Sequence, residues 1–149
     1  MRSIIFVLMI ASYVFGGSYV FLMEKNLDEK ELEAKIVSKI GQDALGKEVS
    51  VYIPNANDNL KNTYKKFCKV VDNCKDADLI FTPSCELVEK ECQPQNKIVL
   101  SSNYKDFKKN ENILGVFFWS KSRPNIVING NRMKKFNIKL PDSYSQFIE

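Results

Sequence analysis

The sequence predicts an α/β fold, a three-layer single domain with a mixed, mostly parallel sheet and a C-terminal hairpin. Three observations lead to this prediction. The apolar run Leu79–Phe81 shows no polar alternation, which is typical of a strand covered on both faces by helices. Segments with helical spacing alternate with strand-like segments along the chain. Near the C-terminus, the strand-like runs 113–119 and 125–129 are joined by a turn-rich link short enough for a hairpin.

The first part of the domain predicts a helix, a strand and a second helix. Apolar residues recur at helical spacing from 27 to 45, early glutamates and later lysines suit the helix dipole, and Gly46 supplies the stop. The segment 49–53 alternates apolar and polar residues, which indicates a strand. A turn at 54–58 provides N-cap candidates for the second helix. The inner face of that helix is marked by Leu60, Tyr64 and Phe67.

The remaining elements continue this alternation. Pro83 and Ser84 end one strand and start a short helix, and Asn129 or Asn131 caps another helix near the C-terminus. In chain order we expect strands at 69–71, 77–82 and 97–101, helices at 86–91, 104–109 and 132–136, the hairpin, and a final amphipathic turn at 144–148.

The N-terminus has the layout of an export signal. Arg2 gives one positive charge, and residues 4–23 are uncharged and mostly apolar. Small residues favour cleavage after Ser18, but the run is also about 20 residues long, enough to cross a bilayer as a helix. We therefore expect 1–23 to be a signal peptide or an N-terminal membrane anchor, and 24–149 to form one domain outside the cytoplasm.

The composition excludes several classes of function. The formal net charge of +4 is spread over isolated lysine pairs, without the dense basic stripe typical of nucleic-acid binding. The chain has no histidine, which excludes Ser-His-Asp and Cys-His catalysis, histidine-ligated zinc and CxxCH haem attachment. Asp76 and Asp78 share one side of an extended segment, but no further catalytic group accompanies them, so we expect both to be solvated at a strand end. We expect no enzyme activity, no cofactor and no metal.

Four cysteines, Cys68, Cys74, Cys85 and Cys92, fall within one short segment of the chain. In an exported domain an even number of cysteines indicates disulfides, because the compartment is oxidising and a small core gains from cross-linking. A four-cysteine zinc site and a redox-active pair are alternatives, but both normally show CxxC spacing, which is absent here. Free or partly free thiols are a further alternative.

The predicted strands suggest how the cysteines pair. Cys74 and Cys92 each lie just before an apolar run, so in neighbouring parallel strands they would sit at the same end of the sheet. Cys85 and Cys92 enclose a helical segment, which would separate their Cα atoms by about 10 Å. A disulfide needs less than about 7 Å. We therefore expect Cys74–Cys92, which leaves Cys68–Cys85 by exclusion.

The last third of the chain carries a pattern of its own. Gly115 opens an apolar strand, Ile126–Asn129 closes the hairpin, and Ile138 and Leu140 follow nine and eleven residues after Asn129. This pattern resembles the C-terminus of the YfiR-like periplasmic proteins, and the segments 76–81 and 97–101 also fit that family's order of strands. This resemblance implies a non-enzymatic periplasmic domain that restrains a membrane-bound diguanylate cyclase by binding its periplasmic sensor part. Related folds also occur in periplasmic solute-binding proteins.

The predicted hairpin carries the candidate functional residues. Trp119, Lys121 and Arg123 bring an aromatic ring and two cations to one turn, where Arg could clamp a carboxylate or phosphate while Trp stacks on an apolar surface. The alternative is a hairpin tip with a packed Trp and two solvated cations. Phe117 and Phe118 cannot both face the same side of a strand, so one could form an exposed contact patch unless a helix covers it.

Two functions follow from these features. The first is a regulatory domain of YfiR-like type that binds a membrane-bound sensor protein through exposed apolar residues. The alternative is a small periplasmic solute- or anion-binding module in which Arg123 anchors an anionic ligand. The sequence contains no histidine and no recognisable cluster of catalytic residues, and both features argue against an enzyme.

Overall fold

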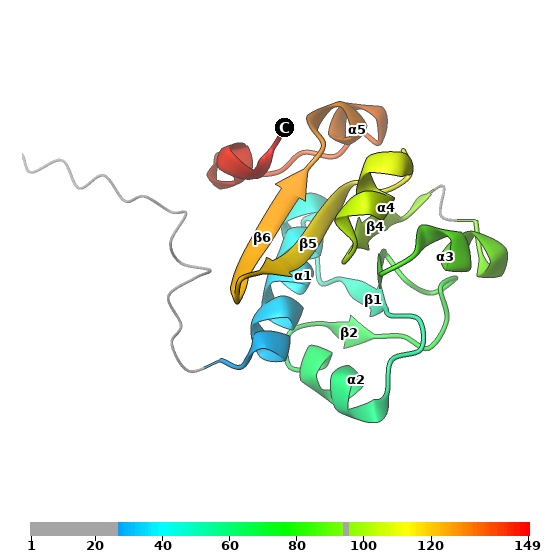
Figure 1. Ribbon diagram of the computed structural model, residues 1–149. Coiled ribbons are helices and arrows are strands. Elements are labelled where there is room, and N and C mark those ends of the chain that lie inside the picture. The colour runs from blue at the N-terminus through cyan, green and yellow to red at the C-terminus, as the bar shows by residue number, and fades with distance from the viewer. Residues whose placement is uncertain (1–26, 94–95) are drawn as a thin grey trace, which may run out of the picture.

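The sheet contains six strands in the order β2-β1-β3-β4-β5-β6 (Figure 1). A computed structural model describes residues 27–93 and 96–149. The strands are β1 (Ser50–Tyr52), β2 (Lys69–Val70), β3 (Leu79–Thr82), β4 (Ile98–Ser101), β5 (Gly115–Ser120) and β6 (Arg123–Ile128). The first five pair in parallel, and β6 pairs antiparallel with β5. The predicted mixed, mostly parallel sheet with a C-terminal hairpin is therefore confirmed.

Several helices begin at a side chain that accepts a hydrogen bond from a backbone N–H group of the first turn. The elements are α1 (Glu29–Leu45), α2 (Asp58–Tyr64), α3 (Cys85–Glu91), α4 (Tyr104–Lys109), α5 (Gly130–Lys135) and the 3-10 helix η3 (Asp142–Phe147). Asp28 caps α1, Asn57 caps α2 and Asn129 caps α5. Of the two cap candidates predicted for this helix, Asn129 is the one that caps it. The helix α5 therefore begins two residues earlier than expected. Gly46 ends α1 at a φ of 65°, which a glycine adopts without steric cost.

Helices cover both faces of the sheet, which gives the predicted three layers. One core cluster includes Ile36 and Ile40 of α1, Tyr64 of α2 and Tyr144 of η3. A second cluster on the other face includes Val88 of α3 and, from α4, Phe107. Figure 1 shows α1 on the opposite side of the sheet from α4. All residues of β3 and β4 are buried, as expected for strands that lack polar alternation.

The cysteine prediction is correct for one pair and wrong for the other. Cys74 and Cys92 form a disulfide with their Cα atoms 6.2 Å apart, and it ties the loop before β3 to the end of α3. Cys68 and Cys85 are free and buried. Cys68 belongs to the first core cluster and Cys85 to the second, so the sheet separates them and the predicted Cys68–Cys85 disulfide does not form. Burial and the nearby Glu89 carboxylate raise the pKa of the Cys85 thiol to about 12.

The predicted export segment at 1–23 lies outside the described residues. Among the helices of 27–93 and 96–149, none combines the length and apolar character that crossing a membrane requires.

Candidate functional site

The connection that follows β1 and the connection that follows β3 pack on opposite faces of the sheet. The connection from β1 to β2 uses α2, which packs in the first core cluster. The connection from β3 to β4 uses α3, which packs in the second cluster on the other face. Neighbouring parallel strands whose connections leave in opposite directions leave a crevice between the loops at their carboxyl ends, the place where open α/β sheets bind ligands. The strand order β2-β1-β3-β4-β5 is that of the flavodoxin-like arrangement.

A pocket of about 270 Å³ occupies this crevice. Its walls come from the loop after β1, from the residues that follow β3 and β4, and from the first turns of α1 and α2. The residues that line it are Lys30, Glu33, Ile53, Pro54, Asn55, Ala56, Asn57, Leu60, Phe81, Pro83 and Ser102. We call this set the carboxyl-edge pocket. Its size lies near the lower end of the range for small-molecule sites.

Hydrogen bonds between residues two positions apart shape the walls of the carboxyl-edge pocket. The buried hydroxyl of Thr82 donates to the Ser84 carbonyl at 2.9 Å, and that of Ser101 donates to the Asn103 carbonyl at 3.2 Å. Such hydroxyl-to-backbone bonds let a strand end in a tight turn. The two turns position Pro83 and Ser102, which follow β3 and β4 and line the pocket beside Phe81 of β3.

The loop after β1 supplies the amide side chains of the pocket. Asn55 adopts a φ of 58°, a left-handed conformation that asparagine tolerates better than most residues. Asn57 accepts a hydrogen bond from the Leu60 N–H at 2.8 Å and so starts α2. The side chain of Asn57 is therefore partly used by the helix, whereas Asn55 is exposed at the edge of the pocket.

The pocket contains one buried carboxylate, that of Glu33. Its side chain is only 7% exposed, and it accepts hydrogen bonds from the Lys30 ammonium at 3.4 Å and the Tyr64 hydroxyl at 3.3 Å. Burial, and then the Glu33 carboxylate, raise the pKa of Tyr64 well above its usual value, so the hydroxyl stays protonated and able to donate. Lys30 and Glu33 are the two charged residues among the described residues that line this pocket.

Sequence reasoning did not identify Glu33, although a signal for it exists. Glu33 lies three, four and seven residues before the apolar Ile36, Val37 and Ile40, which places it on the buried stripe of the helix. An early glutamate in a helix is commonly explained by the helix dipole, and that explanation hides an acidic residue on an apolar face.

Of the predicted aromatic residues of the hairpin, Phe117 is buried, whereas Phe118 and Trp119 are half-buried. Phe117 is 1% exposed and its ring lies 5.7 Å from that of Trp119, with both packed on the first core cluster. Phe118 points to the other face, where the ring of Tyr104 in α4 lies 5.5 Å away. The expectation that Phe117 contributes to an exposed contact patch is therefore wrong, because its ring is buried in the first core cluster. Phe118 is half-buried beside Tyr104, and its role as a contact residue stays a prediction.

The structure separates Trp119 from the predicted cations. Residues directly opposite each other in an antiparallel pair share a face, and Trp119 is opposite Pro124 whereas Ser120 is opposite Arg123. Trp119 and Arg123 thus lie on opposite faces of the hairpin. Arg123 and Lys121 instead border a shallow hollow of about 480 Å³ with Ser120 and Asn125. Arg123 as an anion anchor stays a prediction, but without the aromatic partner expected for it.

The aspartates before β3 have structural partners. Asp78 accepts hydrogen bonds from the Ser50 N–H and the Lys47 ammonium, each at 3.0 Å. Partial burial favours a higher pKa for Asp78, but these donors outweigh it and lower the pKa. The Asp76 carboxylate accepts a hydrogen bond from the Asn73 side-chain amide at 2.8 Å, and the Asp76 backbone N–H donates to the Asn73 side-chain oxygen at 3.0 Å. Both residues lie at the amino end of the parallel strands, away from the carboxyl-edge pocket.

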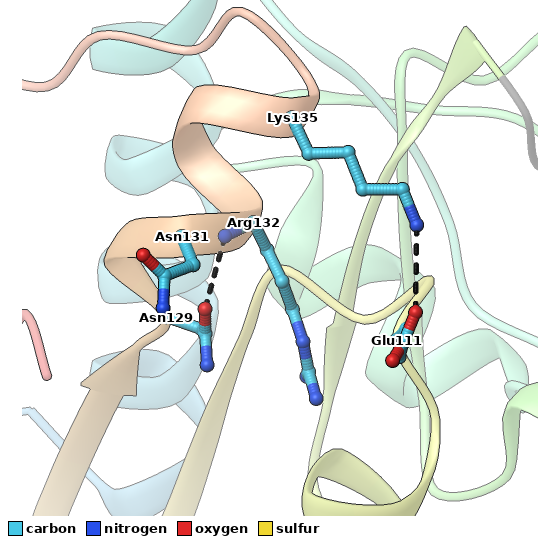
Figure 2. Close-up of a pocket in the computed structure, with 5 residues that line it drawn as sticks. All are labelled: Glu111, Asn129, Asn131, Arg132 and Lys135. Carbon is cyan, nitrogen blue, oxygen red and sulfur yellow. Dashed lines mark hydrogen bonds and ion pairs between the residues drawn. The ribbon is translucent and has the colours of Figure 1, made fainter.

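A second pocket, of about 280 Å³, lies beside α5 and has a structural explanation (Figure 2). Its Arg132 guanidinium donates to the carbonyls of Phe107 and Ile113 at 2.8 and 2.7 Å and stacks over the Phe107 ring. Figure 2 also shows Lys135 reaching Glu111, an ion pair of 3.6 Å. These cations fasten α5 to the segment between α4 and β5, so the pocket offers a ligand little free charge. In the described parts of the chain, no group of three histidine, cysteine or acidic residues could hold a metal ion.

No protein-family model matches the sequence, and no curated protein sequence matches it. Solved structures share its fold. The ABC domain in complex with L-Trp from Streptococcus pneumoniae superposes with a TM-score of 0.58 at 12% identity, over 77% of this chain and 60% of that chain. A conserved domain protein from Vibrio cholerae O1 biovar El Tor superposes with a TM-score of 0.54 at 11% identity, over 82% of this chain and 60% of that chain. The match spans about three fifths of each of these structures, and at such identities it establishes the fold.

Proposed function

We propose that this chain is a non-enzymatic binding module that holds a small solute in the carboxyl-edge pocket and acts outside the cytoplasm. The observation that carries the proposal is the position of the pocket at the carboxyl ends of β1, β3 and β4, where the connections change face. Apolar walls with a few polar groups are typical of small-molecule sites. This pocket is lined by apolar residues such as Phe81 and Leu60 together with polar ones such as Ser102, Asn55 and Glu33.

The structural comparisons support solute binding more than regulation of a membrane sensor. One of the similar solved structures is a complex with L-Trp, a small zwitterion. The sensor-binding proposal, which follows from the YfiR-like resemblance, relied on exposed apolar residues of the hairpin. Phe117 is buried, and Phe118 is half-buried against Tyr104, so this support is reduced to one partly exposed side chain of the predicted pair. Binding to a membrane-bound sensor stays a prediction that the resemblance alone supports.

The proposal is tested by ligand-induced thermal stabilisation of the full chain. Amino acids, small carboxylic acids and small amines are screened, because a ligand that binds only the folded state at 100 times its Kd stabilises the protein by about 2.7 kcal/mol. For a ligand found in this way, Ser102→Trp fills the carboxyl-edge pocket and abolishes the stabilisation.

Two variants separate the candidate sites. Ser120→Trp places the same bulk beside the hairpin hollow and leaves binding unchanged if the ligand occupies the carboxyl-edge pocket. Arg123→Ala tests the predicted anion anchor directly. Loss of binding in Ser120→Trp and Arg123→Ala, with binding retained in Ser102→Trp, would contradict the proposal and move the site to the hairpin. Absence of stabilisation by every compound class would count against solute binding altogether.

A further inference from the structure

We infer that Glu33 is the anchor for a positively charged ammonium group of the ligand, and that Lys30 occupies this position when no ligand is bound. The inference rests on the proposed function, because it assigns a ligand class to the carboxyl-edge pocket. It goes further by predicting that the ligand carries a primary amine or a related cationic nitrogen, as amino acids and alkylamines do.

The first support is the incomplete coordination of the Glu33 carboxylate. Hydrogen bonds between an ammonium group and a carboxylate are normally about 2.7–2.9 Å long. The Lys30 and Tyr64 donors lie at 3.4 and 3.3 Å, and each contacts a different carboxylate oxygen. An ionised carboxylate can accept about four hydrogen bonds. Two long bonds therefore leave much of the acceptor capacity of Glu33 unused.

The second support is the burial of this carboxylate in the wall of a pocket. A charge withdrawn from water needs close partners, because its lost hydration is otherwise not compensated. The Glu33 side chain is only 7% exposed to solvent, yet it also lines a pocket that can admit a small molecule. A ligand ammonium entering from the pocket would supply the close, charged donor that the protein itself does not provide.

The third support is the contrast between the two charged residues. The Lys30 side chain is 63% exposed whereas that of Glu33 is 7% exposed. A solvated lysine at 3.4 Å can rotate back into water at little cost, because its ammonium is already largely hydrated and its contact with Glu33 is longer than a close ion pair. Lys30 is thus a weak internal competitor for the place beside the Glu33 carboxylate that a ligand ammonium would take. Among the described residues that border the pocket, Glu33 is the acidic one.

The inference is tested with two small probes of equal chain length, n-butylammonium and butyrate. Each is titrated into the isotopically labelled full chain, and the amide resonances of Asn55, Ala56 and Ser102 report on the carboxyl-edge pocket. We expect n-butylammonium to shift these resonances. Glu33→Gln, which keeps the shape and removes the charge, weakens n-butylammonium binding about tenfold or more, the usual effect of losing a charge-assisted hydrogen bond.

Two further variants make the test specific. Glu29→Gln removes an exposed glutamate from the same helix and leaves binding unchanged. Lys30→Gln removes the competing cation and tightens n-butylammonium binding by up to about fivefold, a small factor because the Lys30 ammonium is largely solvated and makes one long contact with Glu33. A purely structural role for Glu33 would not produce this gain, and Lys30→Gln remains informative even if Glu33→Gln folds poorly.

The possible failures can be told apart. If butyrate shifts the pocket amides and n-butylammonium does not, solute binding in the pocket stands and the ammonium inference is refuted. If neither probe shifts them, the ammonium inference is refuted, and the thermal screen of all compound classes decides the proposed function separately. Equal losses in Glu33→Gln and Glu29→Gln, or weaker binding in Lys30→Gln, would also overturn the inference.

Discussion

Replacing the pair Cys74 and Cys92 by alanine should lower the free energy of unfolding by about 3 kcal/mol. The disulfide closes a loop between residues 18 positions apart. In the chain-entropy model, cross-linking a loop of this length restricts the unfolded chain by about 3 kcal/mol. The bond joins the loop before β3 to the end of α3, so its removal frees the segment that covers one face of the sheet.

Urea unfolding followed by circular dichroism measures this difference. The m-value should be somewhat larger in the alanine variant, because its unfolded chain lacks the cross-link and exposes more surface. The matched control is Cys68→Ala with Cys85→Ser, which removes the two free thiols and leaves the disulfide in place. A reducing agent should destabilise the natural chain and this control equally, and should leave the Cys74→Ala, Cys92→Ala variant unaffected.

A count of thiols provides the decisive check on the pairing. After unfolding in denaturant without reductant, a chromogenic thiol reagent should detect two thiols, those of Cys68 and Cys85. In the folded protein both should react slowly because they are buried and because their thiols have raised pKa values. A count of zero would show a second disulfide, and a loss of stability below about 1 kcal/mol in the alanine variant would refute the loop-entropy reasoning.

Three further predictions concern stability. Lys121→Asn with Ser122→Gly should stabilise the protein by about 1 kcal/mol in thermal unfolding, because both residues have a positive φ in a two-residue hairpin loop that favours Asn-Gly; no gain would mean that the turn is not strained. Arg132→Ala should cost about 1–3 kcal/mol in urea unfolding, since two backbone carbonyls lose their donor, and Arg132→Lys should recover only part of it. Asp78→Asn should reduce stability at neutral pH and flatten its decline in acid: the pKa of Asp78 is lowered by folding, so its contribution is present above the unfolded value of about 4 and disappears as pH falls through the folded value. An unchanged acid titration of stability in Asp78→Asn would contradict this assignment.

Local patterns in the sequence were sufficient to predict the architecture. Buried strands that lack polar alternation, such as Leu79–Phe81, require cover on both faces, and this requirement alone indicates helices on two sides of a parallel sheet. Capping residues and Gly46 set the helix ends, because they act on neighbours within a few residues. The Cys74–Cys92 pairing could be predicted for a related reason: both residues precede parallel strands, so topology places them at one edge.

The candidate site depended on contacts that local patterns do not carry. The face on which each connection packs decides where the crevice opens, and that choice also separates Cys68 from Cys85. Strand register decides that Trp119 and Arg123 lie on opposite faces, although they are only four positions apart.

The sequence by itself determined the layers, the order of helices and strands, and the absence of histidine chemistry, because each follows from residue type and short-range spacing. Only the tertiary structure decided that Glu33 faces a pocket rather than a sealed core. A buried carboxylate on an apolar stripe becomes a candidate anchor only when loops from β1, β3 and β4, distant in the chain, leave space beside it. That space is a property of packing between segments, which no single stretch of sequence specifies.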